Sequence, residues 1–202
     1  MEMASGTVAC HDGNQRLSLA SLRSLTPDYD QHAEDLKMGY THYYAVDQWS
    51  SPEWQSAWPQ LIQDAIKIID AADVPVSGPA SDTLEAGREV PNPPVVDVNE
   101  GLCINGNNDE YCEDFVLKES DPDNFCKTAK RGYDLVVSCI LLRAYRLAPN
   151  TFHLRSDGIW NDDEDWVPTR ALYHDIWPND TDEKPAELDE RVEDENNLVC
   201  HL

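Results

Sequence analysis

The stretch Phe125-Cys-Lys-Thr-Ala-Lys-Arg-Gly-Tyr-Asp134 runs directly into Leu135-Val-Val-Ser-Cys-Ile-Leu-Leu-Arg-Ala-Tyr-Arg-Leu147, the most apolar segment of the chain. The second segment is apolar on nearly every side, which predicts a helix packed on several faces. Asp134 fits the N-cap of this helix, and Pro149 ends it. We therefore expect a buried helix over residues 134–147, with a basic turn at its start.

Strands and one further helix are expected before this stretch. Gly39–Val46 is rich in aromatic residues and reads as a strand, with Tyr40, His42, Tyr44 and Val46 on one face and Thr41, Tyr43 and Ala45 on the other. Ser50 and Pro52 resemble a helix start, and apolar residues then recur at helical spacing to Ala72. Pro59 conflicts with a continuous helix, so a start near Trp58 is the alternative.

The middle and the end of the chain read mainly as short strands. Residues 95–98 and 101–105 predict two strands or one bulged strand, and 101–117 predicts a hairpin. Residues 151–155 alternate like a strand, and residues 170–177 fit a last strand or a short helix. This order predicts an α+β fold: a mainly antiparallel sheet with two principal helices packed on one face.

The composition divides the chain into three parts and restricts its setting. We expect an N-terminal extension at 1–37, a single α+β domain at 38–178, and an acidic, disordered tail at 179–202. No apolar run approaches the roughly 20 residues of a membrane span, and no signal peptide is evident. Six scattered cysteines indicate reduced thiols in a cytoplasmic protein and no metal site, with a Cys103–Cys112 disulfide as the alternative.

The net charge is the most unusual property of the sequence. There are 39 acidic residues against 15 basic ones, giving a formal charge of −24 at pH 7. Such an excess repels itself in dilute buffer but is screened in strong salt, which favours a salt-adapted protein. The alternative is mimicry of nucleic acid, in which carboxylates replace phosphates. Either way, we expect no direct binding to nucleic acid.

Two motifs carry a resemblance to a known family. Met38-Gly-Tyr-Thr-His-Tyr-Tyr44 and the stretch from Phe125 to Asp134 resemble a family of uncharacterised proteins of phages, archaeal viruses and prokaryotic genomes. That family has M-G-Y-T-H-Y-W and F-C-K-T-A-R-K-P-Y-D at these places, whereas this chain has Tyr44 for the tryptophan and Gly132 for the proline. The resemblance spans roughly residues 38–178. It implies a viral or mobile-element origin, and with it a possible place in the virion, but no activity.

The basic turn is the first candidate site. Lys127, Lys130 and Arg131 lie at the predicted start of a buried helix, where free N–H groups and the helix dipole favour an anion. Tyr40, His42 and Tyr44 share a strand face and could stack a nucleoside. The alternatives are ion pairs with local carboxylates for the cations, and a core face for the aromatic residues.

Two other constellations suggest catalysis. Cys126 beside Lys127 could act as a nucleophile with His42 as its base, or it could be a buried apolar thiol. His153 and Arg155 could join Glu113 and Asp114 in an acid–base or metal cluster, or they could simply face solvent. No cofactor is expected.

The leading functional hypothesis is a small binding protein that holds an anionic ligand, such as a nucleotide, near Lys127–Arg131. The second is a hydrolase that uses Cys126 and His42. The third is an acidic interaction protein or virion component that occludes a basic partner.

Overall fold

The computed structural model describes residues 40–79, 84–85, 88–89 and 91–188, all within one compact unit that spans Met38–Leu202. The expected arm at 1–37 lies outside these residues. The α+β prediction is confirmed: the described strands pair antiparallel, and the described helices number three, not two. None of these helices is long and apolar enough to cross a membrane.

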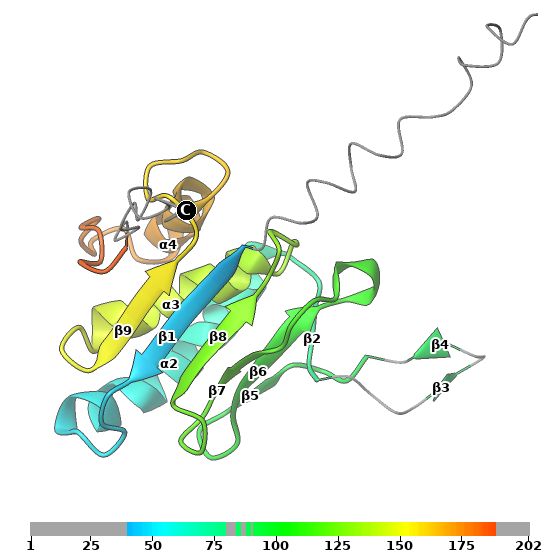
Figure 1. Cartoon of the computed structure of the whole chain (residues 1–202), viewed down its shortest axis with the longest axis horizontal. Helices are drawn as coiled ribbons and strands as arrows, with labels where there is room; N and C mark the ends of the chain where they lie inside the picture. Colours follow the sequence, from blue (N-terminus) through cyan, green and yellow to red (C-terminus); the bar gives the residue numbers. More distant parts are fainter. Residues whose placement is uncertain (1–39, 80–83, 86–87, 90, 189–202) are drawn as a thin grey trace, which may run out of the picture. The chain divides into compact units, whose positions relative to one another are not determined.

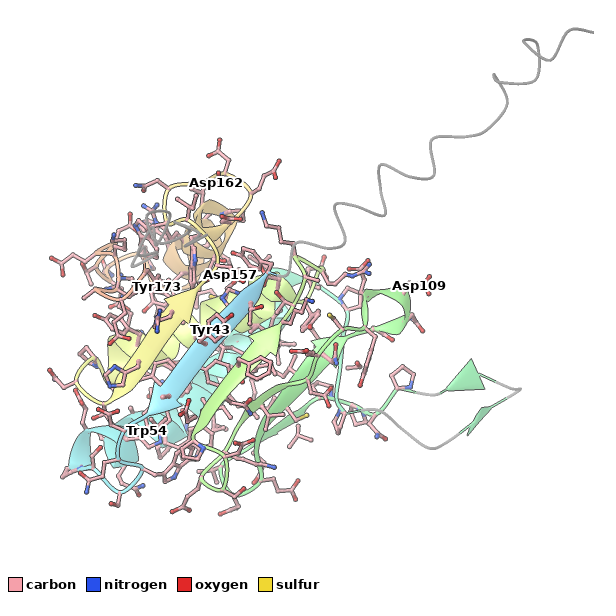
Figure 2. All side chains as sticks on the ribbon, in the orientation of Figure 1. Tyr43, Trp54, Asp109, Asp157, Asp162 and Tyr173 are labelled. Atoms are coloured by element: carbon pink, nitrogen blue, oxygen red, sulfur yellow. The ribbon has the colours of Figure 1, made fainter. Side chains whose placement is uncertain are left out.

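The first sheet has the strand order β8-β1-β9, with β1 at Thr41–Val46, β8 at Asp123–Lys127 and β9 at Phe152–Ser156 (Figure 1). The alternation expected for β1 is present, because His42, Tyr44 and Val46 are buried while Tyr43 is 46% exposed. Tyr43 lies on the open face of this sheet (Figure 2). The helices α2, at Pro52–Ala72, and α3, at Asp134–Leu147, lie behind the other face (Figure 1).

Strand β8 differs from the sequence-based expectation. The stretch from Phe125 to Asp134 was expected to be a basic turn, and the Asp and Asn residues just before it disfavour strands, yet 123–127 pairs along β1 from Thr41↔Lys127 to Ala45↔Asp123. Phe125 lies opposite Tyr43, and the two ring centres are 6.4 Å apart. Pairing with an existing strand therefore outweighs the weak local propensity.

The second sheet is built around β6 at Gly101–Gly106. It pairs with β5 at Val95–Asp97, β7 at Phe115–Leu117 and β2 at Val76–Ser77. Both the two-strand interpretation of 95–105 and the 101–117 hairpin are thus correct. A short 3-10 helix, Asn108–Glu110, lies between β6 and β7, and Leu84–Glu85 pairs with Arg88–Glu89 as β3 and β4.

Helix α2 spans Pro52–Ala72 and contains Pro59, so the alternative start near Trp58 is wrong. Its N-cap is Ser51, not Ser50, and the Ser51 hydroxyl accepts a hydrogen bond from the Trp54 amide. Helix α3 spans Asp134–Leu147, and its N-cap is Tyr133. Asp134, which we expected as the cap, is the first helical residue, and its carboxylate contacts His42 and Thr128 instead.

The last part of the described chain is helical and then irregular. Helix α4 spans Trp166–Ile176, which decides between the strand and helix alternatives for 170–177. The described part of the expected disordered tail, 179–188, packs against the domain, and Leu188 is buried. Residues 189–202 lie outside the described part of the chain.

The core lies between the helices and the sheets. Helix α2 packs on α3, and α3 packs on α4 and β9. The core contains the following fully buried large side chains: Trp54, Trp166, Tyr133, Phe115, Phe152, Leu61, Ile68, Leu102, Ile104, Leu117, Ile140 and Leu141. All four described cysteines are free, so the Cys103–Cys112 disulfide is not formed.

Candidate functional site

The turn between β8 and α3 carries two of the three candidate cations in an unusual backbone conformation. Ala129 and Lys130 have φ of 52° and 54°, and the Arg131 amide donates to the Thr128 carbonyl at 3.0 Å. Non-glycine residues rarely adopt positive φ, and two in succession cost roughly 1–2 kcal/mol each. Backbone strain of this kind is concentrated at functional sites, which makes the turn a candidate site.

Lys130 is already paired. Its ammonium lies 2.6 Å from Asp165 Oδ1 and 5.1 Å from the centre of the Tyr40 ring. The hydrogen bond to Asp165 raises the Lys130 pKa and outweighs the effect of partial burial. For Lys130, the ion-pair alternative is therefore the correct one.

Arg131 differs from Lys130. Its Nε is buried, and within the described residues it has neither a hydrogen-bond partner nor an ion pair. Beside it is a hollow of about 160 Å³, which we call the α3 hollow. Its walls are residues 130–132 of the turn, Asp134 and Leu135 of α3, and Glu164, Asp165, Pro168 and Thr169 around the start of α4.

Lys127 does not line this hollow. It ends strand β8 opposite Thr41, and its backbone amide donates to the Glu113 carboxylate at 2.8 Å. The structure therefore brings two of the three predicted cations together and leaves Lys127 outside the hollow.

His42 is fully buried beneath the start of α3. Its Nε2 lies 2.8 Å from Asp134 Oδ1, which also accepts a hydrogen bond from the Thr128 hydroxyl. The rings of Tyr40 and Trp166 meet the imidazole edge-on, with ring centres 5.2 and 5.6 Å away. Within the described residues, Nδ1 has no hydrogen-bond partner.

Tyr40 and Tyr44 are also buried, with 6% and 2% of their surfaces exposed. The Tyr44 hydroxyl donates to the Val116 carbonyl at 2.8 Å, away from the α3 hollow. Burial raises the pKa of both phenols well above the usual value. The face formed by Tyr40, His42 and Tyr44 is therefore a core face and offers no surface for stacking a base.

Cys126 lacks the properties of a nucleophile. It is fully buried, its thiol donates to the Glu113 carbonyl at 3.5 Å, and burial raises its pKa far above the usual value. His42 lies opposite Cys126 across the β1–β8 pair, but its bonded nitrogen faces Asp134. The geometry favours the apolar-thiol interpretation.

Three of the four residues of the proposed acid–base cluster have separate partners. His153 binds Asp47 and Glu187, Asp114 accepts from the Asn105 side chain, and Glu113 accepts from the Lys127 amide. No group of three or more His, Cys, Asp or Glu in the described part of the chain could hold a metal ion.

Sequence reasoning missed the carboxylates that complete this region. Asp134 was expected only as a cap, and Asp165, which binds Lys130, was not among the candidate residues. The Asp134–His42 and Asp165–Lys130 contacts join segments more than 30 residues apart in the sequence. Local patterns carry no signal for such contacts.

No family model, curated protein or solved structure matches the chain. The resemblance to the viral and prokaryotic family therefore stays a prediction.

Proposed function

We propose that this domain binds a small anionic group in the α3 hollow, with Arg131 as the principal contact. The observation that carries the proposal is a guanidinium whose buried Nε has no hydrogen-bond partner among the described residues. Buried polar groups are normally hydrogen-bonded, and Arg131 lines the α3 hollow, so an anion there is the acceptor that its guanidinium lacks. The first turn of α3 adds a positive dipole end.

The carboxylates in the wall are the main physical objection. Two of the three are already engaged: Asp134 by His42 and Thr128, and Asp165 by Lys130 and the Ile159 amide. Glu164 is exposed on the rim, where water weakens its repulsion of a bound anion. Arg131 itself forms no ion pair within the described residues, so its charge stays available to an anion inside the hollow.

The volume of the hollow limits what it can hold. At about 30 Å³ per water molecule, a hollow of about 160 Å³ has room for one phosphate, sulfate or carboxylate group. Sites for larger ligands usually measure roughly 300–1,000 Å³. A nucleotide would place only a phosphate here, and its base would lie outside the hollow.

Calorimetric titration with inorganic phosphate and sulfate, in a constant chloride background, tests the proposal. Arg131→Gln should weaken phosphate binding by about tenfold or more, because it removes a charge-assisted hydrogen bond. Lys127→Gln is the matched control, since it removes the same charge outside the hollow. Equal weakening by both variants would indicate general electrostatics, and no binding by the unaltered protein would refute the proposal. The third hypothesis, occlusion of a basic partner, would then take precedence.

A further inference from the structure

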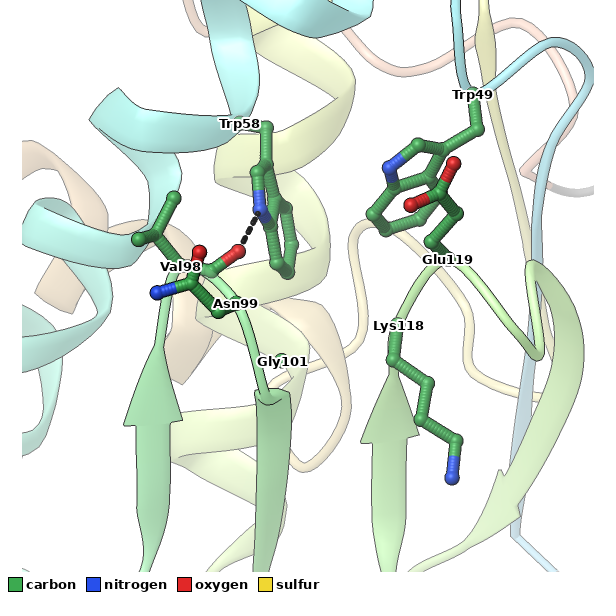
Figure 3. A pocket seen from close by; sticks show the side chains of 7 residues that line it. All are labelled: Trp49, Trp58, Val98, Asn99, Gly101, Lys118 and Glu119. Atoms are coloured by element: carbon green, nitrogen blue, oxygen red, sulfur yellow. Dashed lines mark hydrogen bonds between the residues drawn. The ribbon is translucent and has the colours of Figure 1, made fainter.

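A second concave site lies away from the basic turn and is lined by tryptophan. Trp49, which precedes α2, and Trp58, within α2, bound a pocket of about 200 Å³ whose other walls are the β5–β6 turn, Lys118 and Glu119 (Figure 3). We call it the indole pocket. None of its lining residues belongs to the α3 hollow, so this inference is independent of the proposed function.

The two indoles form a fixed corner. Their ring centres are 5.0 Å apart and their planes meet at 60°. Trp54, which is fully buried, packs against both rings at 5.3 and 5.8 Å. Trp58 Nε1 also donates to the Val98 carbonyl at 2.9 Å (Figure 3). The two indoles therefore need no rearrangement when a ligand enters the pocket, which lowers the entropic cost of binding.

The opposite wall is equally well defined. Asp97 Oδ1 accepts hydrogen bonds from the Asn99 and Glu100 amides at 2.7 and 3.0 Å, which fixes the β5–β6 turn. Gly101 has φ of 98°, and a Cβ there would lie 2.6 Å from the Leu117 carbonyl oxygen. A side chain at this position would force the backbone apart and change the shape of the pocket.

The charged residues at the rim indicate the sign of the charge that a ligand would carry. Glu119 lies on the same side of the pocket as Trp49, whereas the Lys118 side chain extends away from the two indoles (Figure 3). The whole chain carries a formal charge of −24, which raises the local concentration of cations. An anion would meet aromatic faces and a carboxylate, both of which repel it.

We propose that the indole pocket binds an organic cation of the methylated ammonium class. Such a cation is attracted to the negative face of an indole within about 6 Å of the ring centre, and tryptophan is the strongest partner among the aromatic residues. The ammonium group would meet chiefly the Trp49 ring, because Trp58 is only 6% exposed and presents little more than an edge, while Glu119 supplies a carboxylate to balance its charge. The pocket has room for such a group but not for a long attached chain, which would extend into solvent.

Titration of the full chain with choline, in molar potassium chloride to screen non-specific attraction, tests this proposal. The readout is the set of indole N–H signals in a ¹⁵N-correlated NMR spectrum, with the Trp49 signal assigned from Trp49→Phe. Choline should shift the signals of Trp49 and Trp58. Dimethylbutanol, the neutral carbon isostere of choline, should shift them at least about fivefold more weakly.

Two isosteric variants distinguish binding in the indole pocket from general attraction of cations by the negative charge of the protein. Glu119→Gln should weaken choline binding severalfold, whereas Glu100→Gln, on the adjacent turn but outside the pocket lining, should leave it unchanged. The inference would be overturned by equal binding of the neutral isostere, by an unaltered affinity in Glu119→Gln, or by equal losses in the two variants. Shifts confined to other indoles would do the same.

Discussion

Asp64 is the acid on which the packing of three helices depends. Its side chain is fully buried on α2, where it accepts hydrogen bonds from Arg143 of α3 at 2.8 Å and Lys67 at 2.7 Å. Arg143 also binds Asp180 and the Tyr173 hydroxyl, and it stacks on Trp177 at 4.2 Å. In the sequence, Asp64, Arg143 and Asp180 lie far apart, and no local pattern indicates that they pair.

Asp64→Asn should destabilise the protein by about 3 kcal/mol, because it leaves a half-buried guanidinium with one fewer counter-charge. Asp70→Asn on the exposed face of the same helix is the control and should change stability by less than about 0.5 kcal/mol. Urea denaturation of both variants at pH 7 measures the difference. Equal stabilities of the two variants would contradict the role given to Asp64.

The same substitution has a predictable dependence on pH. Burial alone would raise the Asp64 pKa, but hydrogen bonds from Lys67, Gln60 and Arg143 outweigh it and lower the pKa below its usual value. A depressed folded-state pKa gives stability that is present above the unfolded value of about 3.9 and lost as pH falls through the folded value. The deficit of Asp64→Asn should therefore shrink below about pH 4.

At the scale of elements, the segment 179–188 is held to β9 by His153. Its Nδ1 lies 2.6 Å from Glu187 and its Nε2 lies 2.8 Å from Asp47. A neutral imidazole has one N–H, so both carboxylates can accept from it only when the ring is protonated. Glu187, and then Asp47, raise the His153 pKa above its usual value.

A raised pKa gives stability that is complete below the unfolded value of about 6.5 and lost as pH rises through the folded value. We therefore expect segment 179–188 to open more often at alkaline pH. Hydrogen exchange at the Leu188 amide, corrected for its intrinsic pH dependence, measures this opening. His153→Gln should remove the pH dependence, and His174→Gln, on the exposed side of α4, should retain it. A profile that stays flat in the unaltered protein would show that His153 does not hold the segment.

Elements with strong periodicity were predictable, and elements made by contact were not. The alternation of His42 and Tyr44 and the apolar run in 134–147 each reflect burial of one element in the core, so the sequence shows them directly. Strand β8 exists because β1 offers it a partner, and no local pattern records that. The same holds for the candidate site. Lys130 and Arg131 could be predicted from the sequence because they are rare positive charges in an acidic chain. Asp165, the partner of Lys130, could not, because it lies in a distant part of the sequence.

At the scale of the whole molecule, two effects of salt oppose each other. Exposed ion pairs such as Arg170–Asp182 weaken as salt rises, because their attraction is screened. Each such pair contributes at most about 1 kcal/mol. Repulsion among the remaining acids is screened as well, and the formal charge of −24 means that repelling acids far outnumber attracting pairs. Screening of the repulsion between acids should therefore outweigh screening of the ion pairs, so that added salt stabilises the fold.

We expect the free energy of unfolding to rise by about 2 kcal/mol between 0.1 and 2 M potassium chloride, equivalent to a gain in Tm of roughly 4–8 °C. Chloride is preferred to sulfate because sulfate strengthens apolar burial in any protein and would hide the charge effect. A neutral osmolyte at matched water activity supplies the control. A melting temperature that is flat or falls with potassium chloride would refute salt adaptation. The acidic surface would then be better explained as a mimic of nucleic acid, since a mimic must remain folded in dilute buffer to present its carboxylates to a basic partner.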